Sequence, residues 1–481
     1  MADGKRKRCL TLLFAALFGL SLPAAVAAET PLAGGAFTDV VSVGSTMSQS
    51  YAVTKDGSLW AWGDNRYGEL GNGTEGIHAW SPRKALLNDV KEVSGGSYFA
   101  VALKRDGTVW TWGMNDAGRL GIGRSSEPVV SVPRSIALDG VVSVSAAGSG
   151  GFAIREDGTV WTWGDNFGGV LGFPERNILP KPVQIPGLRD IAKIASDAFY
   201  TLAVTEQGEV WGWGSAYPDG KQVIREPQKI ESLTDIVDIS VKSGRYTALR
   251  RDGTVWTEHI DRLDAPVQAK GIPRMKSLAA GISGVPGAID IDGDVWIWNR
   301  IWHDPSSPAE KVEGVSGATQ LTGSGGHWLA LTEDHAVYAW GRNESGQLGI
   351  GQVVERASAP AIVVRPIAIF VDGKSAELPI SPLLVSSRTF VPLRGVLERL
   401  GVEVVWNAEE RTVNLSKNDT EVVLKPGSEE AIVNGKAVRL DAPSIFVNDR
   451  LFVPLRFVGE TVGAAVAWDP ERFRVDVASS P

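Results

Sequence analysis

Short runs of alternating apolar and polar residues recur along most of the chain, and each run has the length of a β-strand. In one repeating unit they cover residues 90–93, 99–103, 108–112 and 132–136. Alternation with a period of two predicts strands that bury one face. The Asp106-Gly107 pair between the second and third runs predicts a tight hairpin, because glycine accepts the positive φ angle of such a turn. The unit is therefore predicted to be a four-stranded antiparallel sheet.

The same hairpin recurs in seven units between residues 37 and 364, and most copies continue into a Trp-x-Trp-Gly sequence. The turn glycine lies at positions 57, 107, 158, 208, 253 and 293, and His335 takes its place in the seventh unit. Trp110 and Trp112 lie on one side of their strand because they are two residues apart. A sheet with two indoles on one face needs a cover, which a neighbouring sheet of the same kind supplies. Seven such sheets closed into a ring form a seven-bladed β-propeller.

A second pattern, Asn-x-x-Gly-x-Leu-Gly, follows the tryptophans in four units. It begins at Asn65, Asn115, Asn166 and Asn343. Its glycines permit a compact loop, and its leucine is expected to fill a position inside the blade. Units four, five and six lack this loop, which accounts for most of their shorter length. The ring is therefore predicted to carry full loops on one part and trimmed loops on the other.

Together the two patterns resemble those of the regulator-of-chromosome-condensation repeat family. The resemblance covers residues 37–364 and implies a seven-bladed propeller. It does not imply the nuclear role of the eukaryotic founder, which is guanine-nucleotide exchange on a small GTPase bound to chromatin. Bacterial secreted members look more relevant, among them a propeller that inhibits β-lactamase by protein–protein contact.

Residues 366–478 contain a different duplication, with an offset of 62 residues. The sequence RTFVPLR at 388–394 returns as RLFVPLR at 450–456, and Trp406 returns as Trp468. Each half predicts two strands, a short helix and a hairpin around its tryptophan, so the segment is a small duplicated α+β domain. The helices are expected at 395–400 and 457–462.

The RTFVPLR sequence and the tryptophan that follows it resemble the copper amine oxidase N-terminal domain, also called a stalk domain. This resemblance implies a spacer or display module. It does not imply amine oxidation, because residues 366–481 contain no His and no Tyr from which a copper and quinone site could be built.

Residues 1–28 have the three parts of a secretory signal. Four basic residues at 5–8 precede an apolar run from Leu10 to Leu22 and small residues at 25–28. The apolar run is too short to span a bilayer comfortably, although an uncleaved anchor is the alternative. The single cysteine, Cys9, lies in this leader. We therefore expect a secreted or surface-associated bacterial protein without disulfides and without a membrane span after removal of the leader.

The formal net charge is −8, which argues against nucleic acid as a partner because phosphate binding needs a basic surface. The five histidines form no HxxxH or HxH pair, and no GxSxG, P-loop or HExxH sequence occurs. We therefore expect no metal, no cofactor and no catalytic centre.

The segment Asp290–Asp294 resembles part of a calcium loop, but its glycine falls in the hairpin position, which favours an ordinary turn. Asp64-Asn65 and Asp165-Asn166 offer repeated carboxylates, yet such residues usually bond to their own backbone.

The clearest candidate for function is the face formed by the first–second and third–fourth loops of the blades. Aromatic and arginine side chains, which are enriched at binding hot spots, lie in or beside these third–fourth loops. They are Tyr67, Trp80, Phe167, Tyr217 and Trp302, with Arg66, Arg119 and Arg342. The alternative for each aromatic residue is packing beneath its own loop. We predict a non-catalytic face that recognises an extracellular protein or an envelope ligand; an extracellular hydrolase or lyase on the same scaffold is the alternative.

Overall fold

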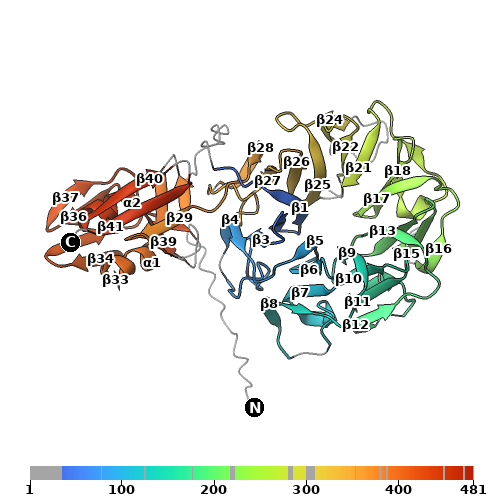
Figure 1. The fold of residues 1–481 in the computed structure, drawn as a ribbon, viewed down its shortest axis with the longest axis horizontal. Helices are drawn as coiled ribbons and strands as arrows, with labels where there is room; N and C mark the ends of the chain where they lie inside the picture. Colours follow the sequence, from blue (N-terminus) through green and yellow to red (C-terminus); the bar gives the residue numbers. More distant parts are fainter. Residues whose placement is uncertain are drawn as a thin grey trace, which may run out of the picture.

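The computed structural model describes residues 35–479 except 77, 124–125, 176, 217–222, 280–284, 299–308, 353, 377, 379–381, 386–387, 448–449 and 470–471. These residues form a ring of β-sheets with a smaller module beside it (Figure 1). Within them, no helix has the length and apolar character needed to cross a membrane.

The ring consists of seven four-stranded antiparallel sheets in the described residues, and each sheet uses four consecutive strands. Blades 1–4 contain β1 (Val40–Ser45), β2 (Gln49–Thr54), β3 (Leu59–Gly63), β4 (Ala79–Lys84), β5 (Val90–Gly95), β6 (Phe99–Lys104), β7 (Val109–Met114), β8 (Val129–Ser135), β9 (Val141–Ala147), β10 (Gly150–Arg155), β11 (Val160–Asp165), β12 (Ile178–Gln184), β13 (Ile191–Ser196), β14 (Tyr200–Thr205), β15 (Val210–Ala216) and β16 (Val223–Lys229). Blades 5–7 contain β17 (Ile236–Lys242), β18 (Arg245–Arg250), β19 (Val255–His259), β20 (Val267–Gln268), β21 (Met275–Ala279), β22 (Gly287–Asp290), β23 (Val295–Trp298), β24 (Ala309–Lys311), β25 (Ala318–Ser324), β26 (His327–Thr332), β27 (Val337–Arg342) and β28 (Arg356–Ile362). The predicted seven-bladed propeller is confirmed.

The hairpins between the second and third strands are fixed by their aspartates. In blade 2, the Asp106 carboxylate accepts the backbone N–H of Thr108 at 3.0 Å and its hydroxyl at 2.6 Å. These bonds, the one from the hydroxyl first, lower the pKa of Asp106. Gly107 has a φ of +80°, and His335 adopts +65° in the matching turn of blade 7. The turn geometry is therefore kept even where the glycine is lost.

The two tryptophans of the repeat differ in burial. The second indole is fully buried between neighbouring sheets in the first four blades, at Trp62, Trp112, Trp163 and Trp213. The first indole is half-buried, and in blade 5 the guanidinium carbon of Arg250 lies 4.1 Å from the ring centroid of Trp256. Complete cover by a neighbouring sheet therefore applies to the second indole, whereas the first one remains partly open to solvent.

The ring closes where blade 7 meets blade 1. The Gln320 side chain accepts the N–H of Val43 at 3.0 Å and donates to its carbonyl at 3.1 Å. The N–H of Phe37 donates to the Val363 carbonyl at 2.8 Å, so the start and the end of the propeller lie side by side. Closure thus uses side chains and a short backbone contact, because each blade is already complete in its own four strands.

The described residues of the module beside the ring form three sheets. Their orders are β30-β29-β41-β40, β31-β32-β39-β38 and β33-β34-β35-β36-β37. The strands are β29 (Ala368–Val371), β30 (Lys374–Ser375), β31 (Leu383–Val385), β32 (Arg388–Pro392), β33 (Glu403–Asn407), β34 (Thr412–Lys417), β35 (Thr420–Leu424), β36 (Glu430–Val433), β37 (Lys436–Arg439), β38 (Ile445–Val447), β39 (Arg450–Pro454), β40 (Ala464–Asp469) and β41 (Arg474–Ser479). The short helices are α1 (Leu393–Val396), η6 (Glu398–Leu400) and α2 (Leu455–Thr461).

The two repeats of the module are related by a local two-fold axis. Val391 pairs with Val453 in the middle sheet, and the flanking pairs are Phe390 with Pro454 and Pro392 with Phe452. The first repeat departs from the predicted single helix at 395–400, because Gly395 has a φ of +99° and separates α1 from the 3-10 turn η6.

The module is docked on blade 1 and is not a freely hanging extension. Trp80 in β4 packs in one buried cluster with Leu383, Phe390 and Phe452 of the module. Phe390 and Phe452 are equivalent residues of the two repeats, so one indole covers a two-fold symmetric apolar patch. The Arg83 guanidinium in the same strand donates to the Leu378 carbonyl at 2.9 Å.

The connection between propeller and module is also short. Val363 belongs to the core at the junction of blades 1 and 7, whereas Ile367 already belongs to the core of the module. Only three residues separate these two anchors, which leaves the connection little freedom.

Candidate binding face

Full loops on one face of the ring are held from two sides. In blade 1, the Asn65 Oδ1 accepts the N–H of Leu70 at 3.0 Å, and Asn65 Nδ2 donates to the Thr74 carbonyl at 2.9 Å. The Trp112 indole of blade 2 donates to the Glu69 carbonyl at 2.6 Å. The loop is therefore fixed both by its own asparagine and by the next blade.

The same indole-to-loop bond occurs at the other full loops. Trp62 donates to the Gln347 carbonyl at 2.9 Å, Trp163 to the Arg119 carbonyl at 3.1 Å and Trp213 to the Val170 carbonyl at 2.8 Å. The last glycine of the blade 2 loop, Gly121, lies against the Trp163 indole of blade 3. A Cβ on Gly121 would lie 2.8 Å from carbon atoms of the Trp163 ring, and the φ of Gly121 is +67°. Both facts require glycine at this position.

Among the described residues, two pairs of aromatic rings lie on this face. Tyr67, from the third–fourth loop of blade 1, contacts Tyr98, from the first–second loop of blade 2, with ring centroids 5.4 Å apart. Phe167 of blade 3 contacts Phe199 of blade 4 at 6.0 Å. Both pairs are edge to face, and Phe167 and Phe199 are 41% and 45% exposed. Large exposed rings that fix each other's orientation are suited to binding a partner at low entropic cost.

The structure adds Tyr98 and Phe199 to the residues predicted for this face. Each stands directly before the second strand of its blade, whereas that position holds Ser48, Ser149 or a residue other than an aromatic one in the remaining units. This position in the repeat was the available signal. Sequence reasoning missed it because only the third–fourth loops were searched for aromatic residues.

The three predicted arginines have different surroundings. Arg66 is exposed, and its Nε–H donates to the buried Asp64 carboxylate at 2.7 Å. Arg342 is exposed at the end of β27. Arg119 is buried beneath its loop and donates to the Ser97 carbonyl. Its burial corrects the prediction that Arg119 contacts a ligand, because the side chain already holds two loops together.

Trp80 is also placed differently from the prediction. It lies in β4 and is buried in the cluster beneath the C-terminal module. It is therefore a docking residue between the two parts of the chain and not a residue of the loop face. The remaining two predicted aromatics, Tyr217 and Trp302, lie outside the described residues.

Two buried titratable groups lie beneath the loops of blades 7 and 1. The Glu69 carboxylate accepts the N–H of Tyr67 at 2.7 Å and the Nε2–H of Gln49 at 3.2 Å, and burial raises the pKa of Glu69 to about 7. His327 Nε2 lies 2.9 Å from the Ser50 hydroxyl, and burial lowers the pKa of His327 to about 4. The stability of this part of the ring is therefore sensitive to pH.

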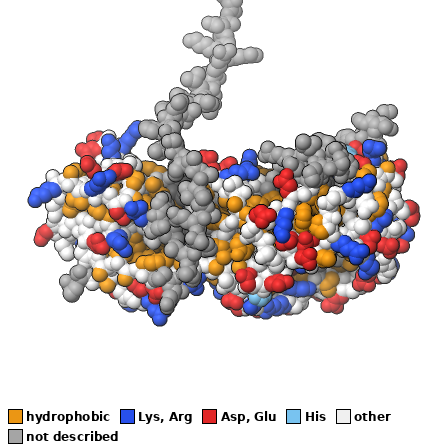
Figure 2. Space-filling model, turned by 90° about the horizontal axis from the view of Figure 1, so that it is seen from above, with side chains coloured by type: hydrophobic (Ala, Val, Ile, Leu, Met, Phe, Trp, Pro, Cys, Tyr) orange, Lys and Arg blue, Asp and Glu red, His pale blue; other side chains and the backbone are white. Residues whose placement is uncertain are grey.

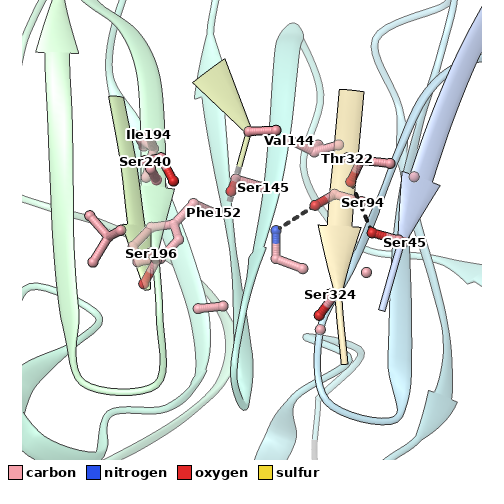
Figure 3. Close-up of a pocket in the computed structure, with 18 of the residues that line it drawn as sticks. Ser45, Ser94, Val144, Ser145, Phe152, Ile194, Ser196, Ser240, Thr322 and Ser324 are labelled. Atoms are coloured by element: carbon pink, nitrogen blue, oxygen red, sulfur yellow. Dashed lines mark hydrogen bonds between the residues drawn. The ribbon is translucent and has the colours of Figure 1, made fainter. Parts of the chain in front are cut away.

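The inner strands surround a central cavity of about 490 Å³, which reaches the first–second loops (Figure 3). Most side chains labelled on its wall carry hydroxyl groups, namely Ser45, Ser94, Ser145, Ser196, Ser240, Thr322 and Ser324. The Ser45 and Thr322 hydroxyls bond to each other at 2.9 Å across the junction of blades 1 and 7. The Ser94 hydroxyl accepts the N–H of Ala146 at 3.0 Å. The Ser45, Thr322 and Ser94 hydroxyls therefore join neighbouring blades.

Carboxylates near the cavity also serve the junctions between blades. Glu92 accepts the hydroxyl of Ser143 at 3.2 Å, and burial raises the pKa of Glu92. Asp238 forms an ion pair with Lys193 and accepts the N–H of Leu278 at 2.8 Å. Each carboxylate bonds to a following blade, which gives it a structural partner.

The other acidic candidates are hairpin residues. The Asp290 carboxylate accepts the N–H of Asp294 at 2.9 Å and the Trp296 indole at 2.8 Å, which makes the segment a capped turn. The described residues contain no group of three or more His, Cys, Asp or Glu placed to hold a metal ion. On the side of the molecule seen in Figure 2, acidic and basic side chains are interspersed.

These features define a class of protein: a closed β-propeller with rigid loops on one face and an accessory module docked on its rim. The model of the regulator of chromosome condensation (RCC1) repeat matches residues 56–103, 106–154, 157–204 and 334–370, and a second model of this repeat matches 41–69, 90–119 and 319–347. The copper amine oxidase N-terminal domain matches residues 370–477. The chain belongs to the RCC1 repeat family and carries a copper amine oxidase N-terminal domain.

Relatives support this assignment. The ultraviolet-B receptor UVR8 of Arabidopsis thaliana is 30% identical over 375 residues, which cover 70% of this chain and 83% of the receptor. The E3 ubiquitin-protein ligase HERC2 of Homo sapiens is 32% identical over 339 residues, or 61% of this chain and 7% of the ligase. The match to HERC2 therefore concerns a small part of that protein.

Solved structures show the same fold. Prp20p from Saccharomyces cerevisiae, whose structure was reported with its binding properties to Gsp1p and histones, has a TM-score of 0.54 at 20% identity and covers 65% of this chain and 87% of Prp20p. Yeast RCC1 (Prp20) bound to Kap60 has a TM-score of 0.54 at 19% identity and covers 74% of this chain and 91% of that chain. At these identities the likeness concerns the fold alone.

Proposed function

We propose that this chain is a non-catalytic binding protein that acts outside the cell or at its surface and recognises a protein or an envelope ligand with its loop face. The propeller is a common protein-binding scaffold, and the secretory pattern in residues 1–28 supports export. One observation carries the proposal. Two aromatic pairs, the half-buried Tyr67 with Tyr98 and the exposed Phe167 with Phe199, lie on the face where rigid loops surround the mouth of the cavity.

The structural roles of the acidic residues support binding over catalysis. A glycoside hydrolase of the usual kind needs two carboxyl groups free to face a substrate. Glu92 and Asp238 instead bond to neighbouring blades, and Asp64 bonds to Arg66. The hydrolase or lyase alternative would need carboxylates released from these contacts.

A capture experiment tests the proposal. The purified chain is used as bait with the envelope fraction and the medium of the producing organism, beside the Phe167→Ala/Phe199→Ala variant. We expect the variant to lose at least one specific partner, because it removes an exposed ring pair from the face. Ile291→Ala is the matched control, since Ile291 is 62% exposed in a hairpin on the opposite face.

Equal capture by the double variant and the chain itself would show that this face is not the recognition surface. Turnover of an extracellular polymer by the purified chain, with loss of that turnover on Glu92→Gln, would favour the hydrolase or lyase instead.

A further inference from the structure

The C-terminal module leaves an apolar row exposed on the outer face of its five-stranded sheet. Register places Val405, Asn414, Val423, Ile432 and Ala437 opposite one another on successive strands. Val405 and Ile432 are 48% and 41% exposed. The alternate residues of the middle strands, such as Val413, Val422 and Ala431, point inward and belong to the core of the module. In the outer strands, Trp406 and Val438 remain exposed. The labels of β36 and β37 lie on the side of the module away from the ring (Figure 1).

The duplicated sheet of the same module provides an internal comparison. Its equivalent row contains Ala467, Asp476, Phe370 and Ser375. Asp476 accepts the Nε–H of Arg474 at 2.9 Å, and the guanidinium carbon of Arg474 lies 4.8 Å from the ring centroid of Phe370. Asp476 corresponds to Asn414, so both rows are polar at this position. The rows differ at the large apolar residues, because Val405 and Ile432 are exposed whereas Phe370 is covered by Arg474. The architecture does not require an exposed apolar row, so its presence on the other sheet needs another explanation.

Charged residues flank the apolar row with opposite sign on its two sides. Glu403 and Glu421 lie two residues before Val405 and Val423, and both are exposed. On the other side, Lys425 follows β35 and Arg439 ends β37; Glu430 lies in that row as well. The first side is therefore acidic, whereas the second side carries Lys425 and Arg439, of which Arg439 is also paired with Glu429 at 3.6 Å.

We propose that this apolar row is a self-association surface that packs against the same row of a second copy of the chain. A two-fold axis along the row stacks the two apolar rows and brings Glu421 of each copy over Lys425 of the other. Such a contact is closed and uses the same residues on both copies. Sheets that pack face to face do so through rows of this kind.

Self-association would have a direct consequence for binding, which rests on the proposed function. The module is anchored by Trp80 and by the short connection from Val363 to Ile367. A pair of chains would hold two loop faces at a fixed separation, so that two contacts to a repetitive surface act together.

Sedimentation of the full chain over a range of concentrations tests the proposal. We expect an apparent mass that rises toward twice the mass of one chain, and Val405→Lys/Ile432→Lys is expected to halve it. Ala467→Lys is the matched control, because Ala467 is the exposed equivalent of Val405 in the other repeat. Circular dichroism and tryptophan fluorescence show whether each variant is folded.

A charge exchange makes the test specific for the proposed orientation. Glu421→Lys alone and Lys425→Glu alone are each expected to weaken the pair, whereas a mixture of the two variants restores it. A single-chain mass at every concentration would overturn the proposal, and so would pairing that Val405→Lys/Ile432→Lys leaves intact. If the unaltered chain stays monomeric and Val405→Lys/Ile432→Lys loses binding to an envelope glycan, the row binds that ligand and not a second copy.

Discussion

Blades 1–3 and 7 differ from blades 4–6 in more than loop length. In the first group, each full loop gives a carbonyl oxygen to the buried tryptophan of the next blade, as Glu69 does for Trp112. In blade 5, which follows a trimmed blade, Glu258 stands where the tryptophan would be, and its carboxylate accepts the N–H of His259 at 2.8 Å. In blade 5 the indole is absent and the preceding unit lacks the loop pattern, whereas blade 6 keeps the buried Trp298 although unit five also lacks the loop pattern.

Blade 7 shows a different solution after a trimmed blade. Trp340 stacks on Trp328 with an interplanar angle of 17° and ring centroids 6.3 Å apart. A blade that follows a trimmed loop can therefore keep its indole when another aromatic ring packs against it. The matched repeats leave out residues 205–318, which correspond to the trimmed part of the ring.

The strongest test of this comparison is removal of one buried indole. Trp163→Ala deletes a fully buried ring and its bond to the Arg119 carbonyl. We expect the free energy of unfolding to fall by about 3–5 kcal/mol, the usual cost of removing a large buried aromatic side chain. Denaturant unfolding measures it. Trp161→Ala in the same strand is the control, and an equal loss there would contradict the difference in burial.

The next test uses pH, because the full loop of blade 1 contains the buried Glu69. Its folded pKa of about 7 lies above the ordinary 4.5, so the folded protein prefers the protonated carboxyl group. This contribution to stability is complete below about pH 4.5 and is lost as pH rises through about 7. At ~1.4 kcal/mol per pKa unit, the free energy of unfolding falls by roughly 3 kcal/mol. Glu69→Gln is expected to remove this loss.

His327 changes stability in the opposite sense and must be separated from Glu69. Its pKa is lowered to about 4, so its contribution is complete above its ordinary 6.5 and is lost as pH falls. Unfolding free energies measured across this range for the unaltered chain, Glu69→Gln and the double variant with His327→Gln distinguish the two groups. A Glu69→Gln variant that still loses stability above pH 6.5 would refute the assignment to Glu69.

A smaller effect is expected from the glycine that lies against the indole. Gly121 and Gly187 both have positive φ angles, +67° and +79°, but only Gly121 has an indole within 4 Å of an added Cβ. Substitution by alanine should strain both backbones. Overpacking against the indole should lower the free energy of unfolding of Gly121→Ala by about 1–3 kcal/mol more than that of Gly187→Ala. Equal costs in thermal unfolding would show that backbone strain alone explains the glycine.

The sequence predicted the ring well because its signals are local. In blade 2, four strands were expected at 90–93, 99–103, 108–112 and 132–136. The structure has Val90–Gly95, Phe99–Lys104, Val109–Met114 and Val129–Ser135. Alternation, the Asp-Gly turn and the paired tryptophans all report contacts within one blade or with the next one.

The binding face was harder to predict because exposure depends on contacts between distant parts of the chain. Trp80 looks like a loop aromatic in the sequence, yet the partners that bury it, Phe390 and Phe452, lie about 300 or more residues away. Arg119 looks like a surface cation, yet it bonds to the Ser97 carbonyl in the neighbouring first–second loop. Neither contact leaves a periodic mark in the sequence.

The smallest expected effect concerns the pair that carries the proposed function. Phe167 and Phe199 contact each other edge to face at 6.0 Å while both remain exposed. A double-mutant cycle with alanine at both positions should give a coupling of about 0.5–1.5 kcal/mol in stability, as measured for aromatic pairs.

Binding should respond differently from stability in the same four proteins. If the pair is a single recognition element, each alanine substitution should weaken partner capture nearly as much as both together, because the remaining ring loses its fixed orientation. Additive losses in binding, together with a coupling near zero in stability, would show two independent contacts. In that case the loop-to-indole bonds alone would make this face suitable for binding. Loops with the same backbone and no aromatic residues would then bind the partner as well.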